Sequence, residues 1–461
     1  MGQAYIIGVG KSGTTSARLL KLKGWDVELS DRNSSPILEE KKQALEEEGI
    51  TVKLGYTPTL EENQLPDLMV VSPGVPWDVP LLVEARSKGI DTIGEMELAW
   101  RYLNSSPWVG ITGTNGKTTT TALTAAIFQA ANLSAPACGN IGYAACDLAI
   151  KAHFESSHPD WVVAEISSYQ VESSRGLAPQ IGIFTTLTPD HLKRHYSLEN
   201  YYEIKASLLR RCQQQIINGD DPYLRSKGLE SWPNACWTSV KGKNNLLCSP
   251  EKGVYLEDSW VIAFGEKILP VNSLKMAGEH NQQNLLMAVA AARLAGIDQT
   301  AINKAIENFP GVPHRLERMC TIEGVDFIND SKATNYDAAI VGLNAVAGPT
   351  ILIAGGEIKK GDDTPWLTTV INQAAAVLLI GEAANHFASR LQQLGYENYE
   401  VVETMDNAVS RGAELAPQKG ASVVLLSPAC ASFDQYRSFE HRGKHFRDLC
   451  LARLGDGVSD S

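Results

Sequence analysis

A glycine-rich stretch carries the residues with the clearest chemistry. Residues 109–119 read VGITGTNGKTT, an apolar run followed by glycines, a lysine and threonines. Backbone N–H groups of such a loop can converge on phosphate oxygens, because glycine has no Cβ to block the approach. Lys117 would then bridge the β- and γ-phosphates of a nucleotide, and the hydroxyl of Thr118 would hold Mg²⁺. The general G-x-x-x-x-G-K-[ST] pattern expects glycine where Ile111 stands, but the order of strand, loop and helix predicts a phosphate-binding loop rather than a chance glycine-rich turn.

Other polar side chains follow apolar strands of the same region. Residues 160–165 read DWVVAE and end in Glu165, where phosphate-loop enzymes place the acid that orders Mg²⁺. Residues 181–187 form another apolar strand, and Asp190 and His191 come soon after it. The carboxyl ends of parallel strands meet at one sheet edge, so we expect these groups to lie near the phosphate loop. A solvated strand-end acid and a structural histidine are the alternatives for Glu165 and His191, and the spacing alone leaves them open.

A second glycine motif lies at the start of the chain. An apolar strand at residues 4–7 leads into residues 8–13, GVGKSG, which match G-x-G-x-x-G. A helix and a second strand follow, and Asp31 ends that strand. Taken alone, this βαβ unit predicts an NAD site with the acid on the ribose. It also fits another nucleotide diphosphate near the first helix, or a tight turn without a ligand.

The elements that position these groups alternate between strand and helix, which predicts an α/β protein with parallel sheets. A chain of 461 residues is too long for one ordinary core, so we expect several domains. A polar stretch at 104–107 and a breaker-rich stretch at 310–313 suit two boundaries. The expected domains are a Rossmann-like βαβ domain (1–104), a central P-loop ATPase-type parallel-sheet domain (105–310) and a Rossmann-like α/β domain (311–461). Within the second, residues 213–271 are expected to form short strands and turns.

Composition narrows the class of protein. The net charge of −12 and the pI near 5.3 argue against general nucleic-acid binding. The eight cysteines include no C-x-x-C spacing, so neither a zinc site nor a disulfide framework is predicted. The first residues show no basic segment before the first strand, and no apolar run is long enough to span a bilayer. We therefore expect a cytoplasmic protein with no nucleic-acid or membrane partner.

Taken together, the motifs resemble those of the Mur ligase family, ATP-dependent amide-forming enzymes of peptidoglycan synthesis. The family's loop reads TGTNGKT, as residues 112–118 do, which accounts for the departure from the general pattern. The resemblance covers nearly the whole chain in order. Its other carriers are residues 139–142 (GNIG), 165–170 (EISSYQ), 190–191 (DH), 313–315 (PHR), 329–335 (NDSKATN) and 427–435 (SPACASFDQ).

The resemblance implies a reaction and its substrates. ATP would phosphorylate a carboxylate, and an amine would attack the acyl phosphate to give an amide, ADP and phosphate. The implied substrates are UDP-N-acetylmuramoyl-L-alanine, D-glutamate and ATP, used by a protein that is expected to be a monomer. Such chemistry needs charge neutralisation and positioning more than covalent help from the protein. The implied cofactors are two Mg²⁺ ions and a carbamylated Lys205, a residue that nothing local distinguishes from a solvated lysine.

The resemblance also implies a role for individual residues. The implied catalytic set is Lys117, Glu165, His191, Lys205 and Lys332. The implied metal ligands are Thr118, Glu165, His191 and Lys205. The implied ATP contacts are Gly113, Thr114, Asn115, Gly116, Lys117, Thr118, Thr119, Asn281, Arg315 and Asp330. The implied substrate contacts are Lys11, Ser12, Asp31, Arg32 and Asn140 for the sugar nucleotide, with Ser167, and Lys332, Thr334, Lys359 (or its neighbour Lys360), Ser432 and Phe439 around D-glutamate.

Four other functions fit the sequence less well. A folylpolyglutamate synthase would share the phosphate loop but lack the separate N-terminal βαβ domain. A sister ligase adding diaminopimelate typically shows D-N-P-R in its third domain, and that tetrapeptide is absent. An NAD-dependent oxidoreductase would explain residues 1–31 and nothing after residue 110. A phosphate-loop switch or binding module would need neither the cluster of acid, histidine and lysine nor a third domain.

Overall fold

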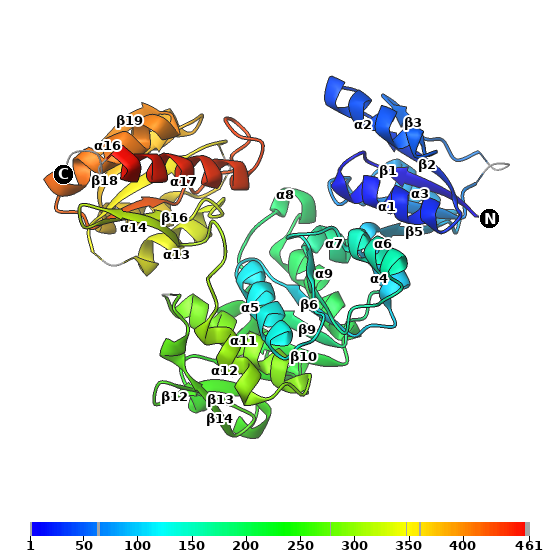
Figure 1. The fold of residues 1–461 in the computed structure, drawn as a ribbon, viewed down its shortest axis with the longest axis horizontal. Helices are drawn as coiled ribbons and strands as arrows, with labels where there is room; N and C mark the ends of the chain where they lie inside the picture. The colour runs from blue at the N-terminus through cyan, green and yellow to red at the C-terminus, as the bar shows by residue number, and fades with distance from the viewer. Residues whose placement is uncertain (1, 62–64, 277, 347, 359–360, 457–461) are drawn as a thin grey trace. The chain divides into compact units, whose positions relative to one another are not determined.

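The computed structural model describes residues 2–61, 65–276, 278–346, 348–358 and 361–456. The described residues form three β-sheets of five, nine and six strands, each packed with its own helices (Figure 1). The predicted α/β class is therefore confirmed. By its internal contacts the chain divides into two compact units, residues 1–274 with 281–309, and residues 275–280 with 310–461. The first unit holds the five- and nine-stranded sheets, and the second holds the six-stranded sheet.

The N-terminal sheet is parallel and has the order β3-β2-β1-β4-β5. Its strands are β1 (Gln3–Ile7), β2 (Asp26–Asp31), β3 (Thr51–Leu54), β4 (Leu68–Val71) and β5 (Asp91–Gly94). Its helices are α1 (Lys11–Leu22), α2 (Pro36–Glu47), α3 (Pro80–Ser87) and α4 (Glu95–Leu103). The predicted βαβ unit is present, and α1 begins inside the glycine motif, at Lys11. Helices α2 and α3 both start with proline, whose fixed φ suits the first helical position.

The central sheet has the order β14-β13-β12-β11-β10-β9-β6-β8-β7. Its strands are β6 (Trp108–Thr112), β7 (Ala137–Gly139), β8 (Val162–Glu165), β9 (Ile181–Phe184), β10 (Gln214–Asn218), β11 (Cys236–Ser239), β12 (Val254–Glu257), β13 (Trp260–Ala263) and β14 (Glu266–Pro270). Strands β7 to β12 pair in parallel, and β12, β13 and β14 pair antiparallel. Strand β6 lies between β8 and β9, so the ends of these three fully buried strands come together. The sheet therefore brings Thr112, Glu165 and Phe184 to one edge.

The helices of this region are α5 (Lys117–Ala130), α6 (Ala145–Glu155), α7 (Ser168–Glu172), α8 (Leu192–His195), α9 (Leu198–Arg211), α10 (Pro222–Ser231), α11 (Glu279–Leu294) and α12 (Gln299–Glu307). Helix α10 contradicts the interpretation of residues 213–271 as strands and turns alone. Asp221 starts this helix by accepting a bond from the N–H of Leu224 at 2.9 Å, and Pro222 fills its first position. Gly228, at φ +52°, interrupts it. The interruption removed the long periodic pattern by which helices are recognised.

The C-terminal sheet has the order β15-β16-β20-β17-β18-β19, parallel except for the β15–β16 hairpin. Its strands are β15 (Glu317–Ile322), β16 (Val325–Asn329), β17 (Thr350–Gly355), β18 (Ala374–Ile380), β19 (Tyr399–Glu403) and β20 (Val423–Leu426). Its helices are α13 (Tyr336–Ala345), α14 (Thr364–Gln373), α15 (Ala384–Gln393), α16 (Met405–Gln418) and α17 (Phe439–Asp456).

Alternate residues of the C-terminal strands supply two cores. On β17, Leu352 and Ala354 pack with α13, α14 and α15, whereas Ile351 and Ile353 pack with α16 and α17. This alternation is the period-two pattern of a sheet covered on both faces. Among the described helices of the whole chain, none is both long and apolar enough to cross a membrane.

Candidate active site

The phosphate loop joins the end of β6 to the start of α5. Gly113 has φ +147°, and a Cβ built there would lie 2.0 Å from Oγ1 of Thr185. Gly116 has φ +84°, and a Cβ there would lie 2.6 Å from Oδ1 of Asn284. Both positions therefore require glycine for conformation and for space. The helix follows directly, so its first backbone N–H groups and the positive end of its dipole face the loop.

Two threonines after β9 hold this loop in place. The N–H of Thr114 donates to the carbonyl of Thr186 at 2.8 Å, and the N–H of Asn115 donates to Oγ1 of Thr186 at 2.9 Å. Oγ1 of Thr185 donates to the carbonyl of Asn115 at 2.5 Å. The loop is thus preorganised by hydroxyl groups that the sequence analysis did not select. Their only signal was the position of two hydroxyl residues directly after a buried strand.

The hydroxyl of Thr118 and the carboxylate of Glu165 are in direct contact. Oγ1 of Thr118 donates to Oε2 of Glu165 at 2.8 Å, and both side chains are buried. The other oxygen, Oε1, accepts from Nδ2 of Asn140 at 2.8 Å. Hydroxyl and carboxylate oxygens are ligands that Mg²⁺ prefers. This pair, at the end of β8 and the start of α5, therefore fits the predicted metal-binding position.

Lys117 and Lys205 converge on the same loop from different helices. Nζ of Lys117 donates to the carbonyls of Gly113 and Thr114 at 3.0 and 2.7 Å. Nζ of Lys205, on α9, donates to the carbonyl of Gly113 at 2.8 Å and lies 4.6 Å from the ring centroid of Tyr201. Lys205 is only 1% exposed. Burial, followed by the charge of Lys117, lowers the pKa of Lys205 well below its ordinary value, while Asp190 and Glu165 oppose the shift.

His191 lies beside this cluster in a strained backbone conformation. Its φ is +55°, a value that favours glycine, at the residue before the short helix α8. Nδ1 of His191 lies 3.1 Å from the hydroxyl of Tyr169, and Nε2 lies 3.5 Å from a carboxylate oxygen of Asp190. The side chain is 44% exposed, so the imidazole borders solvent, whereas Glu165 and Lys205 are buried.

A second histidine, His195, was not expected at the site. It is fully buried, and its Nε2 lies 2.9 Å from Oγ of Ser168. Burial, and then the charges of His191 and Lys205, lower its pKa to about 4. The imidazole is therefore neutral at neutral pH. Ser167, which is predicted to contact substrate, also caps the neighbouring helix α7 by forming a capping box with Gln170.

The predicted metal set is only partly composed of ordinary metal ligands. Among the described residues, no group of three or more His, Cys, Asp and Glu side chains is placed to hold a metal ion. The predicted set contains one carboxylate and one imidazole, with a hydroxyl and a lysine. Within this set, a second anionic ligand would exist only if Lys205 carried a carbamate.

The N-terminal sheet has its own cavity at the glycine motif. Its volume is about 770 Å³, a size typical of small-molecule sites, and its lining includes Lys11, Ser12, Asp31 and Arg32. Asp31 accepts bonds from the N–H groups of Val9 and Asn33 at 3.0 and 2.9 Å, so its carboxylate shapes the loop around the cavity. All four N-terminal residues predicted to bind substrate are thus brought together.

A short loop after β7 connects this cavity with the phosphate loop. Nζ of Lys11 donates to the carbonyl of Gly142 at 2.7 Å. Two residues earlier in the same loop, Asn140 holds Glu165. The loop after β7 therefore links the N-terminal cavity to the phosphate loop through two hydrogen bonds, one to Lys11 and one to Glu165.

The C-terminal unit gathers a separate group at the ends of β16 and β20. Asp330 is buried and accepts a bond from Oγ of Ser427 at 2.9 Å. Burial raises its pKa to about 7, and Arg315 and Ser427 oppose the shift. Nζ of Lys332 lies 5.2 Å from the ring centroid of Phe439. A cation close to an aromatic face at this distance is attracted to it.

The remaining predicted residues lie in the C-terminal unit, in the unit with the phosphate loop, or outside the described residues. Ser432 is buried in the loop after β20, and Thr334 is half-buried in the loop after β16. Asn281 is buried on α11, in the unit that contains the phosphate loop. Lys359 and its neighbour Lys360 lie outside the described residues.

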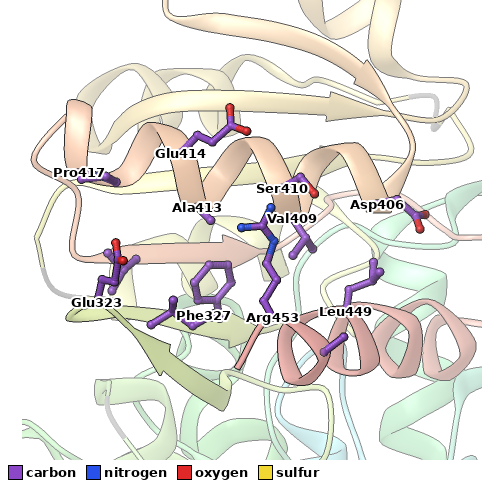
Figure 2. A pocket seen from close by; sticks show the side chains of 13 residues that line it. Glu323, Phe327, Asp406, Val409, Ser410, Ala413, Glu414, Pro417, Leu449 and Arg453 are labelled. Carbon is purple, nitrogen blue, oxygen red and sulfur yellow. The ribbon is translucent and has the colours of Figure 1, made fainter. Parts of the chain in front are cut away.

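A further cavity in the C-terminal unit is lined, among the described residues, by side chains other than the predicted ones. Its volume is about 710 Å³, and it lies between α16, α17 and the start of β16. Figure 2 shows Ser410 and Glu414 of α16, Phe327 of β16 and Arg453 of α17 around this space. The cavity lies at the amino end of β16, whereas the predicted motif at residues 329–335 follows the carboxyl end of the same strand.

Comparisons with known proteins give consistent matches along the chain. Residues 2–94 match the family model "Mur ligase MurD-like, N-terminal domain". Residues 111–292 match "Mur ligase middle domain", and residues 314–430 match "Mur ligase, glutamate ligase domain".

Curated relatives match over almost their full length. A protein of Microcystis aeruginosa named UDP-N-acetylmuramoylalanine–D-glutamate ligase is 67% identical over 98% of this chain and 100% of its own. Proteins with the same name from Rippkaea orientalis and a Synechocystis species are 67% and 62% identical, each over 98% of this chain and 99% of their own.

Solved structures share the fold. The UDP-N-acetylmuramate-alanine ligase of Thermotoga maritima aligns with a TM-score of 0.59 at 21% identity, over 98% of this chain and 100% of that chain. A pseudomurein peptide ligase of Methanothermus fervidus aligns with a TM-score of 0.59 at 20% identity, over the same shares. These structures establish the shared fold, and the curated relatives and family models establish kinship. The chain belongs to the Mur ligase family.

Proposed function

We propose that the chain is an ATP-dependent ligase that joins D-glutamate to UDP-N-acetylmuramoyl-L-alanine in the synthesis of peptidoglycan precursors. The near-full-length relatives with that name support the substrate assignment. The structural observation that carries the reaction type is the direct contact of Thr118 with Glu165, beside Lys117. A hydroxyl, a carboxylate and a lysine around a glycine loop are the groups that phosphoryl transfer from ATP requires.

The phosphate loop binds ATP and directs its γ-phosphoryl group to the alanyl carboxylate of the sugar nucleotide. Lys117 neutralises charge on the transferred group, and the N–H groups of the loop hold the phosphate oxygens. D-Glutamate then attacks the acyl phosphate through its amine, forming the amide and releasing phosphate. The proposed ATP contacts are Gly113, Thr114, Asn115, Gly116, Lys117, Thr118, Thr119, Asn281, Arg315 and Asp330.

The N-terminal cavity binds the uridine diphosphate part of the sugar nucleotide. Its glycine motif, with Lys11 and Ser12, faces the diphosphate, and Arg32 lies in the same lining. The link from Lys11 to the loop that holds Glu165 supports this assignment, because it joins the cavity to the reacting end of the same substrate. A nicotinamide cofactor is not needed to explain the G-x-G-x-x-G motif.

The C-terminal cluster binds D-glutamate. Lys332 supplies a cation for one of the two carboxylates, and Thr334 and Ser432 supply hydroxyl groups. Phe439 packs against Lys332 and limits the directions its ammonium can take. Lys359 is proposed from the family resemblance alone.

Two Mg²⁺ ions support the reaction, held by Thr118, Glu165, His191 and a carbamate on Lys205. The metals supply charge neutralisation for the phosphate oxygens. The lysine fits this role because its lowered pKa favours the neutral amine, which is the form that reacts with CO₂. Conversion of a cation into an anion would also remove the repulsion between Lys205 and Lys117.

We further propose that the three domains occupy residues 1–104, 105–310 and 311–461, and that the protein acts as a cytoplasmic monomer. The three sheets fall inside these ranges. Light scattering of the purified protein tests the monomer, and a dimer mass would contradict it.

Phosphate release from ATP tests the function. The assay contains purified protein, Mg²⁺ and UDP-N-acetylmuramoyl-L-alanine, with D-glutamate, L-glutamate, diaminopimelate or L-lysine in parallel. Release that depends on D-glutamate alone is expected. Release with another amino acid would keep the reaction type and overturn the substrate, and no release with any of them would overturn the proposal.

A further inference from the structure

Arg442 is a buried arginine that donates hydrogen bonds to hydroxyl and carbonyl oxygens. It lies in the first turn of α17 and is 1% exposed. Among the described residues the guanidinium makes no ion pair, and its hydrogen bonds go to uncharged oxygens. Burial lowers its pKa to about 10, with Asp434 opposing the shift through space, so the group stays charged at neutral pH. Burying a charged group costs free energy unless its donors are hydrogen-bonded, so the bonds of the Arg442 guanidinium determine whether this position is tolerated.

The donors of Arg442 go to both loops that carry the proposed D-glutamate contacts. Nε donates to Oγ of Ser331 at 3.0 Å, and Nη2 donates to the carbonyl of Ser331 at 2.9 Å. Nη2 also donates to the carbonyl of Cys430 at 3.1 Å, and Nη1 donates to the carbonyl of Ala431 at 3.3 Å. The first loop follows β16 and the second follows β20, and these strands pair in parallel.

The carbonyls that Arg442 holds precede the side chains proposed to bind D-glutamate. The Ser331 carbonyl belongs to the peptide bond that leads into Lys332, and the Ala431 carbonyl to the one that leads into Ser432. Fixing these peptide planes fixes the directions in which both side chains leave the backbone. Oγ of Ser331 also donates to the carbonyl of Phe439 at 2.8 Å, which ties the aromatic partner of Lys332 into the same network.

Gly356 lies close to the guanidinium and to one of its acceptors. A Cβ built on Gly356, which has φ +137°, would lie 2.3 Å from the carbonyl oxygen of Ala431 and 3.1 Å from Nη1 of Arg442. The N–H of Glu357 donates to the same Ala431 oxygen at 2.9 Å. Lysine could not replace Arg442 here, because one ammonium cannot reproduce donors spread over a rigid fork.

We infer that Arg442 is a positioning residue for the amino-acid site, acting through the backbone of the two loops. The inference rests on the proposed function for the identity of the ligand. The guanidinium sets the distance between Lys332 on one loop and Ser432 on the other, and so the spacing of groups that a dicarboxylate amino acid would meet.

The kinetic test uses Arg442→Lys with Arg453→Lys as its matched control. Arg453 lies in the last turns of the same helix and is half-buried, beside the cavity of Figure 2. For Arg442→Lys we expect kcat/KM for D-glutamate to fall about 100-fold, because misplacement of reacting groups by about 1 Å costs rates of this order. The KM values for ATP and the sugar nucleotide should stay within about twofold, and Arg453→Lys should match the wild type.

A second variant covers the case in which Arg442→Lys does not fold. Ser331→Ala removes the Nε acceptor and the bond to Phe439 while keeping the arginine. It should raise the KM for D-glutamate about tenfold, as expected for one hydrogen bond to a charged group. A uniform loss for all three substrates together with a lower Tm would mean a merely structural role and would overturn the inference.

Hydrogen exchange provides a readout that does not depend on the ligand. In Arg442→Lys, or in Ser331→Ala, amide exchange should increase in residues 329–335 and 427–435 and remain unchanged in α13 and α14. Unchanged exchange in both loops would overturn the inference even if the wild type proved to be an active D-glutamate ligase. Absence of D-glutamate-dependent phosphate release by the wild type would instead refute the proposed function, while increased loop exchange would still support the positioning by Arg442.

Discussion

Lys117 and Lys205 donate to the same oxygen, the carbonyl of Gly113, at 3.0 and 2.8 Å. Two ammonium groups on one acceptor repel each other, and one of them is fully buried. The arrangement is stable when Lys205 gives up its proton, which is the direction in which its pKa is shifted. Lys117 can thus remain a cation that faces phosphate, whereas the lowered pKa of Lys205 favours the neutral amine that a carbamate requires.

Removal of Lys117 should abolish most of the activity. Lys117→Ala would delete the charge contact proposed for the transferring phosphoryl group, so we expect turnover to fall about 10³-fold. Phosphate release under saturating substrates measures the effect, with thermal unfolding as a check on folding. Lys151→Ala is the control, because Lys151 is exposed and its ion pair with exposed Glu155, at 3.7 Å, is of a kind that contributes little. Near-normal turnover of Lys117→Ala would remove this residue from the reaction.

Carbamylation of Lys205 should be directly observable. Because the lowered pKa increases the fraction of neutral amine near pH 7, CO₂ should add to Nζ more readily than to an exposed lysine. Protein equilibrated with ¹³C-bicarbonate should show a carbamate carbon signal by NMR that is missing from Lys205→Gln and retained in Lys151→Gln. A signal that persists in Lys205→Gln would place the carbamate elsewhere, and no signal in the wild type would refute it.

A buried acid between the two sheets of the first unit should make stability depend on pH. Glu95, the first residue of α4, accepts from the N–H of Cys146 on α6 at 2.7 Å and is 1% exposed. Burial raises its pKa from 4.5 to about 7, with Asp147 adding to the shift and the Cys146 bond and Lys11 opposing it. Between these values the folded state holds a proton that the unfolded state has lost. The stabilisation is therefore complete below pH 4.5 and is lost as pH rises through 7.

The variant Glu95→Gln isolates this contribution. Its amide oxygen can still accept from Cys146, but it does not ionise. From pH 5 to pH 8 the wild type should lose about 2–3 kcal/mol of stability relative to the variant, the free energy that corresponds to the shift. Urea unfolding at the two pH values measures it. Asp330, whose pKa is also raised to about 7, is present in both proteins and cancels in the difference. Parallel pH profiles would contradict the assignment.

Loss of Asn140 should weaken metal binding. The side chain holds Oε1 of Glu165, so Asn140→Ala frees the carboxylate to rotate away from Thr118. We expect the Mg²⁺ concentration for half-maximal activity to rise about 10-fold, the low end for loss of an outer partner of a metal ligand. A Mg²⁺ titration of phosphate release measures this, with Asn308→Ala at the exposed end of α12 as the control. An unchanged titration would show that Glu165 is held without Asn140.

The sequence allowed the positions at strand ends to be predicted because parallel strands bring their carboxyl ends together. Glu165 was placed beside the phosphate loop by this rule, whereas the loop itself was predicted from its glycine motif. The βαβ unit at the start of the chain was likewise correct as structure. Its ligand was not fixed by the motif, since Asp31 is occupied with the N–H groups of Val9 and Asn33.

The residues that sequence analysis missed act through tertiary contacts. Arg442 lies in a polar helix and has the pattern of a solvated arginine, and only the fold shows that it reaches two loops. Thr185 and Asn284 are close to the phosphate loop only because β9 and α11 pack beside it. His195 follows His191 by one helical turn, and spacing does not reveal that it is the buried one of the two. Helix α10 was missed because Gly228 breaks its period.

The conformation of Gly113 also limits how this protein can change. Any side chain there would meet the hydroxyl of Thr185 and would need a backbone angle that L-residues rarely adopt. A library randomised at residues 113 and 185 should therefore return glycine at the first position whatever is accepted at the second. Shortening the threonine removes one contact but leaves the backbone angle and the backbone N of Thr186, 2.9 Å from such a Cβ, unchanged. We therefore expect residue 113 to remain glycine during evolution, and substitutions that change substrate preference to occur in the surrounding loops.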